Sequence, residues 1–169
     1  HAFAQRGFSF LRFNFRGVGR SQGVFSRGEG ELSDAATALD WLQSYNENSS
    51  QCWVAGFSFG AWIGMQLLMR RPEINSFVSV APPANMFDFS FLAPCPSSGL
   101  VLHGDKDEVV PPNSVDKLID KLRQQKGITI DLKTISGANH FFPGQTDKLD
   151  QHVGSYVDRA LSDENAEAK

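Results

Sequence analysis

The chain has 169 residues, of which 41% are hydrophobic, and a formal net charge of −3. This length and apolar content suit one domain with a single core, and the mildly acidic balance argues against nucleic acid or an anionic membrane as a main partner. No apolar stretch approaches the roughly 18–20 residues that cross a bilayer, and the two cysteines, Cys52 and Cys95, are too few for a disulfide scaffold and fit the reducing cytoplasm.

The predicted elements alternate between strands and helices along the chain. Residues 8–15, which are rich in phenylalanine and follow Gly7, are predicted to form the first strand, and residues 1–7 the last turns of a preceding helix. Later strands are predicted from short apolar runs, and later helices from apolar residues that recur every three or four positions. In chain order they are helix 31–43, strand 52–57, helix 59–71, strands 76–81 and 100–103, a helix capped by Asn113, strand 128–135, helix 147–161 and a polar tail at 162–169.

This alternation, with short connections, predicts the α/β class. We expect a mostly parallel sheet with helices on both faces, in a single domain that covers residues 1–161. Ligands of such sheets bind beyond the carboxyl ends of the strands. Catalytic residues are therefore expected in the loops that follow the strands.

The loop after strand 52–57 carries a nucleophile motif. Gly56, Ser58 and Gly60 form G-x-S-x-G between a strand and a helix, the setting in which a strained turn presents a serine hydroxyl above the sheet. Both glycines are expected to let neighbouring backbone approach, and the helix start offers the free amide of Phe59 to an oxyanion. The alternative is a chance glycine–serine turn, which the flanking strand and helix disfavour.

A serine nucleophile needs a base and an acid that orients the base. His140 follows the last predicted strand and is the best-placed base, whereas His103 lies inside an apolar strand end and is expected to be packed. Asp105 and Asp107 follow the preceding strand, and either can supply the acid. The resulting chain order of serine, aspartate and histidine is that of the α/β hydrolases.

These motifs resemble the α/β-hydrolase superfamily, in particular its small, lidless members near the dienelactone hydrolases. Residues 14–21 are similar to the family's D-x-R-G-x-G-x-S turn, with Asn14 in place of the aspartate. Residues 103–111 resemble the segment H-G-x-x-D-x-x-V-P, which implies that Asp107 is the acid and Asp105 a turn or capping residue. Dienelactone hydrolases use a cysteine nucleophile, so Ser58 departs from their pattern.

The resemblance implies a serine hydrolase that cleaves small carboxylic esters or thioesters through an acyl-enzyme. Its catalytic triad would be Ser58, Asp107 and His140, with the amide of Phe59 in the oxyanion hole. No metal or organic cofactor is expected, because the sequence has no H-E-x-x-H, Cys/His cluster or P-loop. The candidates for the substrate pocket are Phe57, Met86 and Phe87; the alternative is that such aromatic residues only cover the sheet.

A second hypothesis is a catalytically incompetent hydrolase-like module or fragment that acts only in binding. In the resembled fold a further strand lies between residues 8–15 and 52–57, and the loop after that strand supplies a second oxyanion donor. Neither has a counterpart in this sequence. We therefore expect an N-terminally incomplete α/β-hydrolase fold that lacks its first strands.

Overall fold

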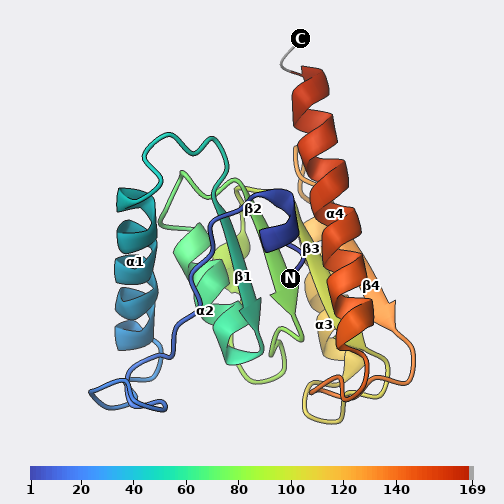
Figure 1. Cartoon of the computed structure of the whole chain (residues 1–169). Helices are drawn as coiled ribbons and strands as arrows, with labels where there is room; N and C mark the ends of the chain where they lie inside the picture. Colours follow the sequence, from blue (N-terminus) through green and yellow to red (C-terminus); the bar gives the residue numbers. More distant parts are fainter. Residues whose placement is uncertain (168–169) are drawn as a thin grey trace.

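The fold is built on a four-stranded parallel sheet with the strand order β1-β2-β3-β4 (Figure 1). The structure is a computed structural model that describes the backbone of residues 1–167 and the side chains of residues 1–163. The strands are β1 (Trp53–Phe57), β2 (Ser76–Val80), β3 (Gly99–Gly104) and β4 (Ile130–Ile135). The α-helices are α1 (Glu29–Ser44), α2 (Phe59–Leu68), α3 (Pro112–Arg123) and α4 (Thr146–Glu167). The predicted α/β class is confirmed.

Helices cover both faces of the sheet, because alternate strand residues are apolar on both sides. On one face, Phe77 and Val101 pack with Ile63 of α2 and Ile119 of α3 in the larger core cluster. On the other face, Val78, Leu100 and Leu102 pack with Tyr156 of α4 in a second cluster. Parallel strands with near-continuous apolar sequences are typically buried on both faces, as these are.

All four strands point the same way, so their carboxyl ends lie at one edge of the sheet (Figure 1). Phe57, the last residue of β1, pairs in register with Val80, the last of β2. Gly104 and Ile135, the last residues of β3 and β4, are likewise paired. The loops that carry the predicted catalytic residues therefore start from adjacent positions.

The predicted first strand is wrong. Residues 8–15 form an extended segment without strand pairing, and the last predicted helical turns before it are a short 3-10 helix, Ala4–Arg6, which ends at Gly7. A groove of about 960 Å³ lies between this segment and β1, and its lining includes Phe13, Phe15 and Val54. An apolar run becomes a strand only when its backbone meets a partner ladder, and β1 pairs only with β2 within the described part of the chain.

Several predicted boundaries also move. Helix α2 ends at Leu68 rather than at residue 71, and α3 begins at Pro112, so Asn113 lies inside the helix instead of capping it. A proline is well suited to the start of a helix because its missing amide has no intrahelical partner there. Helix α4 continues through most of the expected polar tail as far as Glu167, since residues 162–167 include no glycine or proline. Residues 168–169 of that tail lie outside the described residues.

The turn at residues 14–21 is held against α1 by charge. The Arg16 guanidinium pairs with both carboxylate oxygens of Asp34, and Asp34 also accepts the Arg16 amide. Within the turn, the Ser21 hydroxyl donates to the carbonyl of Asn14 over 2.8 Å. Asn14 thus takes part through its backbone, an interaction that does not require an aspartate.

Among the residues that the structure describes, no helix is both long and apolar enough to cross a membrane.

Candidate active site

A strained backbone turn lies between β1 and α2. Ser58 adopts φ 50° and ψ −119°, a conformation that side-chain-bearing residues rarely take, and it directly precedes the first residue of α2. A Cβ on Gly56 would lie 2.3 Å from the carbonyl oxygen of Gly60, so only glycine allows the first turn of the helix to approach β1 this closely. A Cβ on Gly60 would meet nothing within 4 Å, so the expectation of a steric need at Gly60 is wrong.

Two backbone amides have separate roles at this turn: that of Ser58 anchors it to β2, and that of Phe59 is free to donate a hydrogen bond. The amide of Ser58 donates to the carbonyl of Val80 over 2.8 Å, which ties the turn to the end of β2. Phe59 is the first residue of α2, so its amide has no acceptor within the helix. It remains available to a negatively charged oxygen at the positive end of the helix dipole.

His140 connects the serine to a buried carboxylate. Its Nε2 lies 3.0 Å from Ser58 Oγ, and its Nδ1 lies 2.8 Å from Asp107 Oδ2. Because an ionised carboxylate only accepts hydrogen bonds, Nδ1 carries the proton and Nε2 is free to accept the serine hydroxyl. His140 is only 4% exposed and Asp107 3%, so the pair is shielded from solvent.

The second oxygen of Asp107 is held by backbone. Its Oδ1 accepts the amides of Val109, at 2.9 Å, and Val110, at 2.7 Å. The carboxylate therefore has one oxygen committed to its own loop and the other to His140. This division fixes the direction in which the acid points.

The loops that carry Asp107 and His140 are fastened to each other. The Asp105 carboxylate accepts the Gly137 amide over 2.7 Å, and the Lys106 amide donates to the carbonyl of Ala138 over 3.0 Å. A Cβ on Gly104 would lie 2.2 Å from that same carbonyl oxygen, so the two loops meet backbone to backbone. Asp105 thus makes a capping contact, whereas Asp107 faces the histidine.

Comparisons with known proteins bear on this arrangement. Residues 1–93, more than half of the chain, match the family model of X-Pro dipeptidyl-peptidase (S15 family), and residues 77–163 match that of the prolyl oligopeptidase family. The crystal structure of ATU1826 from Agrobacterium tumefaciens, described as a protein of unknown function with a proposed α/β-hydrolase assignment, is 61% identical. The match covers 96% of this chain and 75% of that one, with a TM-score of 0.93.

The chain belongs to the α/β-hydrolase superfamily.

Two further proteins are similar to the chain, and the first of them is itself described as an α/β hydrolase. XC6422 from Xanthomonas campestris, described as an α/β serine hydrolase without a lid, is 35% identical over 88% of this chain and 65% of that chain, with a TM-score of 0.78. The uncharacterized protein RP471 of Rickettsia prowazekii is 52% identical over 155 residues. That match takes in 89% of this chain and 65% of the relative, so the chain spans just under two thirds of the length of this curated relative.

The three residues predicted for the pocket occupy different surroundings in this α/β hydrolase. Phe57 lies beside the catalytic candidates, with its ring 5.1 Å from that of His140. Phe87 instead stacks on Trp62 at 4.3 Å and packs within an aromatic cluster over α2. Met86, next to it, is 53% exposed in the segment between β2 and β3.

The sequence did not signal Phe141 or the part that His103 plays. Phe141 directly follows His140, and its ring stands edge-on to the imidazole at 5.1 Å. His103 is buried in β3, as expected, but its Nε2 also donates to the carbonyl of Val110 over 2.9 Å, inside the loop that holds Asp107. The sequence offered only their positions: Phe141 directly follows His140, and His103 is the last residue but one of the strand before Asp107.

Among the described residues, no group of three or more histidine, cysteine, aspartate or glutamate side chains is placed to hold a metal ion.

His103 is expected to make the stability of this α/β hydrolase depend on pH. Burial lowers the pKa of His103 below its usual value of about 6.5, and the nearby Asp107 carboxylate opposes this only in part. Its Nδ1 is buried and has no partner in the described structure, which also fits a neutral ring. Below the unfolded pKa, the unfolded chain binds a proton at His103 that the folded chain resists, so the free energy of unfolding should fall as pH drops from about 7 toward the lowered folded pKa.

Urea denaturation across this pH range measures the effect. His103→Gln keeps an N–H donor for Val110 but has no proton to gain, so its unfolding free energy should depend less on pH than that of the natural protein. His152→Gln, on the partly exposed surface of α4, is the matched control and should retain the natural pH dependence. Equal pH dependence in the natural protein and His103→Gln would contradict the assignment.

Proposed function

We propose that the protein is a serine hydrolase that cleaves small carboxylic esters or thioesters through an acyl-enzyme. Ser58 is the nucleophile, His140 the general base and acid, and Asp107 the group that orients His140. The observation that carries the proposal is the unbroken line of hydrogen bonds from the strained Ser58, through His140, to a carboxylate held by two amides. A hydroxyl in such a line is the activated nucleophile of acyl-transfer enzymes.

The reaction follows from the protons on these groups. His140 Nε2 removes the proton of Ser58 as Oγ attacks the acyl carbonyl, and Asp107 stabilises the imidazolium that forms. The tetrahedral oxyanion accepts the amide of Phe59 at the start of α2. As the bond to the leaving group breaks, Nε2–H gives its proton to the leaving oxygen or sulfur. Water, deprotonated in turn by His140, then attacks the acyl carbon, and Nε2–H returns the proton to Ser58 Oγ as the bond to the acid breaks.

The relatives support this class of reaction. XC6422 is described as an α/β serine hydrolase without a lid, and in this chain Ser58 is half-buried, so its hydroxyl remains accessible. Both matched family models describe peptidases, which favours peptide amides as a second candidate substrate class because amides undergo the same acyl transfer to serine. Turnover of a prolyl p-nitroanilide, compared with that of a p-nitrophenyl ester, distinguishes the two.

We place the enzyme in the cytoplasm on its cysteine chemistry. Cys52 and Cys95 are both free thiols, and burial raises the pKa of each, so both remain protonated and unreactive. Free thiols of this kind are typical of a reducing compartment.

A fluorophosphonate probe tests the nucleophile directly. The probe should label the folded protein at Ser58, and peptide mass mapping identifies the modified residue. Ser58→Ala should give no labelling while retaining the circular dichroism spectrum of the natural protein. Folded protein that stays unlabelled would contradict the proposal and favour the alternative of an inert, binding-only module.

A further inference from the structure

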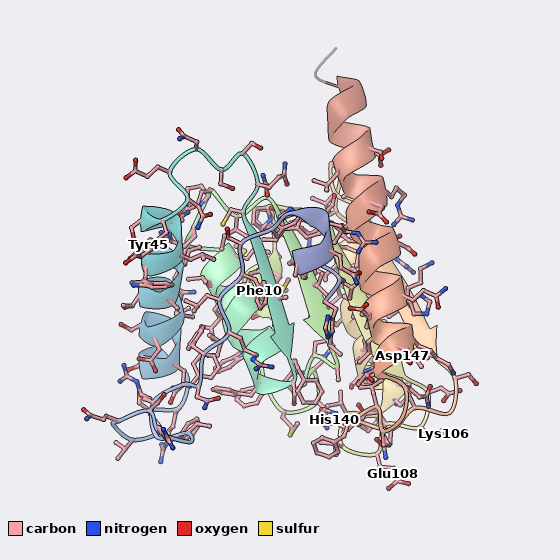
Figure 2. The ribbon with its side chains drawn as sticks, in the orientation of Figure 1. Phe10, Tyr45, Lys106, Glu108, His140 and Asp147 are labelled. Carbon is pink, nitrogen blue, oxygen red and sulfur yellow. The ribbon has the colours of Figure 1, made fainter. Side chains whose placement is uncertain are left out.

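Two exposed phenyl rings flank the proposed proton-transfer residue. Phe57 is 44% exposed and Phe141 70% exposed, and both ring centroids lie 5.1 Å from the imidazole of His140. The two phenyl rings are 6.3 Å apart, close enough for one ligand group to touch both. We call Phe57 and Phe141 the phenyl pair. Figure 2 shows His140 at the end of the sheet where the strand loops gather, with Lys106 and Glu108 marking the loop after β3.

The proton transfer requires the alcohol part of an ester to lie beside His140. For the C–O bond to break, His140 Nε2 must pass its proton to the leaving alcohol oxygen, which requires about 2.6–3.2 Å between the two atoms. The carbonyl oxygen is drawn the other way, to the amide of Phe59 at the start of α2. The carbon chain attached to the leaving oxygen therefore begins beside His140, where the phenyl pair lies.

The phenyl pair also has the surface that such a group needs. Aromatic side chains left in water gain free energy when an apolar group covers them. The rings stand at interplanar angles of 43° and 88° to the imidazole, so they form a bent wall around it instead of stacking on it. A bent apolar wall accepts an alkyl or aryl group more readily than a charged or hydroxyl-rich one.

We propose that the phenyl pair is the alcohol subsite of this enzyme and that its substrates are esters with an apolar alkyl or aryl alcohol. This inference rests on the proposed function and deepens it. Phe57 and Phe141 are specificity residues, since they contact the leaving group and take no part in proton transfer. The preference of the enzyme for a given acyl-chain length is set by other residues and does not depend on the phenyl pair.

Two ester series measured on the full chain separate the subsites. The first series consists of ethyl, butyl and phenethyl acetate. The acetyl group is constant in this series, and the three alcohols differ little in leaving ability. From ethyl to phenethyl acetate, kcat/KM should rise by about 10–100-fold, the range that apolar pockets give. The second series keeps ethanol constant and lengthens the acyl group from acetate to butyrate to hexanoate.

Phe141→Ala is the decisive variant, because the side chain is largely exposed and its removal disturbs little packing. It should reduce the rise across the alcohol series to about threefold or less and leave the ratios across the acyl series unchanged. Phe57→Ala should act in the same direction. Tyr45→Ala removes an equally exposed aromatic ring just after the end of α1, away from His140 (Figure 2), and should alter neither series.

The possible outcomes test the alcohol subsite separately from the proposed serine-hydrolase function. A flat alcohol series in a protein that the fluorophosphonate labels at Ser58 would overturn the alcohol subsite and leave the serine hydrolase standing. A Phe141→Ala effect on the acyl series instead would also overturn it, because the phenyl pair would then hold the other half of the ester. No turnover of any ester and no labelling would overturn the proposed function itself.

Discussion

Ser58→Ala is expected to lower kcat for a short-chain p-nitrophenyl ester by a factor on the order of 10⁶, the scale seen when a serine nucleophile is removed. The loss is large because, among the described residues, the hydroxyl bonded to His140 is that of Ser58: His140 Nε2 is bonded to Ser58 Oγ, and its Nδ1 to Asp107. Stopped-flow or steady-state release of p-nitrophenol measures it. KM should change far less than kcat, since the alanine leaves the surrounding walls in place.

Ser44→Ala is the matched control for this experiment. The Ser44 hydroxyl is exposed at the end of α1 and donates to the carbonyl of Trp41, so its removal should leave turnover unchanged. Equal rates for Ser58→Ala and the natural protein would show that the hydrolysis does not pass through this serine.

Asp107→Asn is expected to lower kcat by about 10⁴-fold with little change in the fold. The asparagine oxygen can still accept the amides of Val109 and Val110, which turns its NH₂ group toward His140 Nδ1. Nδ1 must then accept instead of donate, so the proton moves to Nε2 and His140 can no longer take a proton from Ser58. The kcat/KM of the variant, measured with the same ester, tests this tautomer argument.

Asp105→Asn supplies the comparison, two residues away. Its oxygen can still accept the Gly137 amide, so the loop contact survives and the rate should fall by less than about tenfold. A larger loss in Asp105→Asn than in Asp107→Asn would reverse the roles given to the two aspartates.

The sequence predicted the sheet and the residues of the candidate site because each depends on local information. Apolar runs in the middle of the chain became β1 to β4, and the parallel α/β class is confirmed. Ser58, Asp107 and His140 each follow a strand, and parallel strands bring such positions to one edge, so the structure brings these three side chains into contact. Their catalytic roles stay predictions.

The failures arose where the outcome depends on distant neighbours. Residues 8–15 have the composition of a strand, but ladder pairing needs a second strand that local sequence does not reveal. Gly60 fits the motif as well as Gly56, yet only at Gly56 would a side chain strike backbone. Phe141 is one phenylalanine among 14, and only the fold distinguishes it by placing it in water beside His140.

The unusual backbone conformation of Ser58 places a thermodynamic demand on the whole molecule. Holding a non-glycine residue at such angles costs about 1–3 kcal/mol, in a fold whose total stability is typically about 5–15 kcal/mol. The protein bears this cost continuously, with or without a bound ligand. The hydroxyl is therefore oriented during folding, and no part of a ligand's binding energy is needed to reorient it. Glycine would adopt these angles without that cost, so the hydroxyl is held in place at the expense of stability.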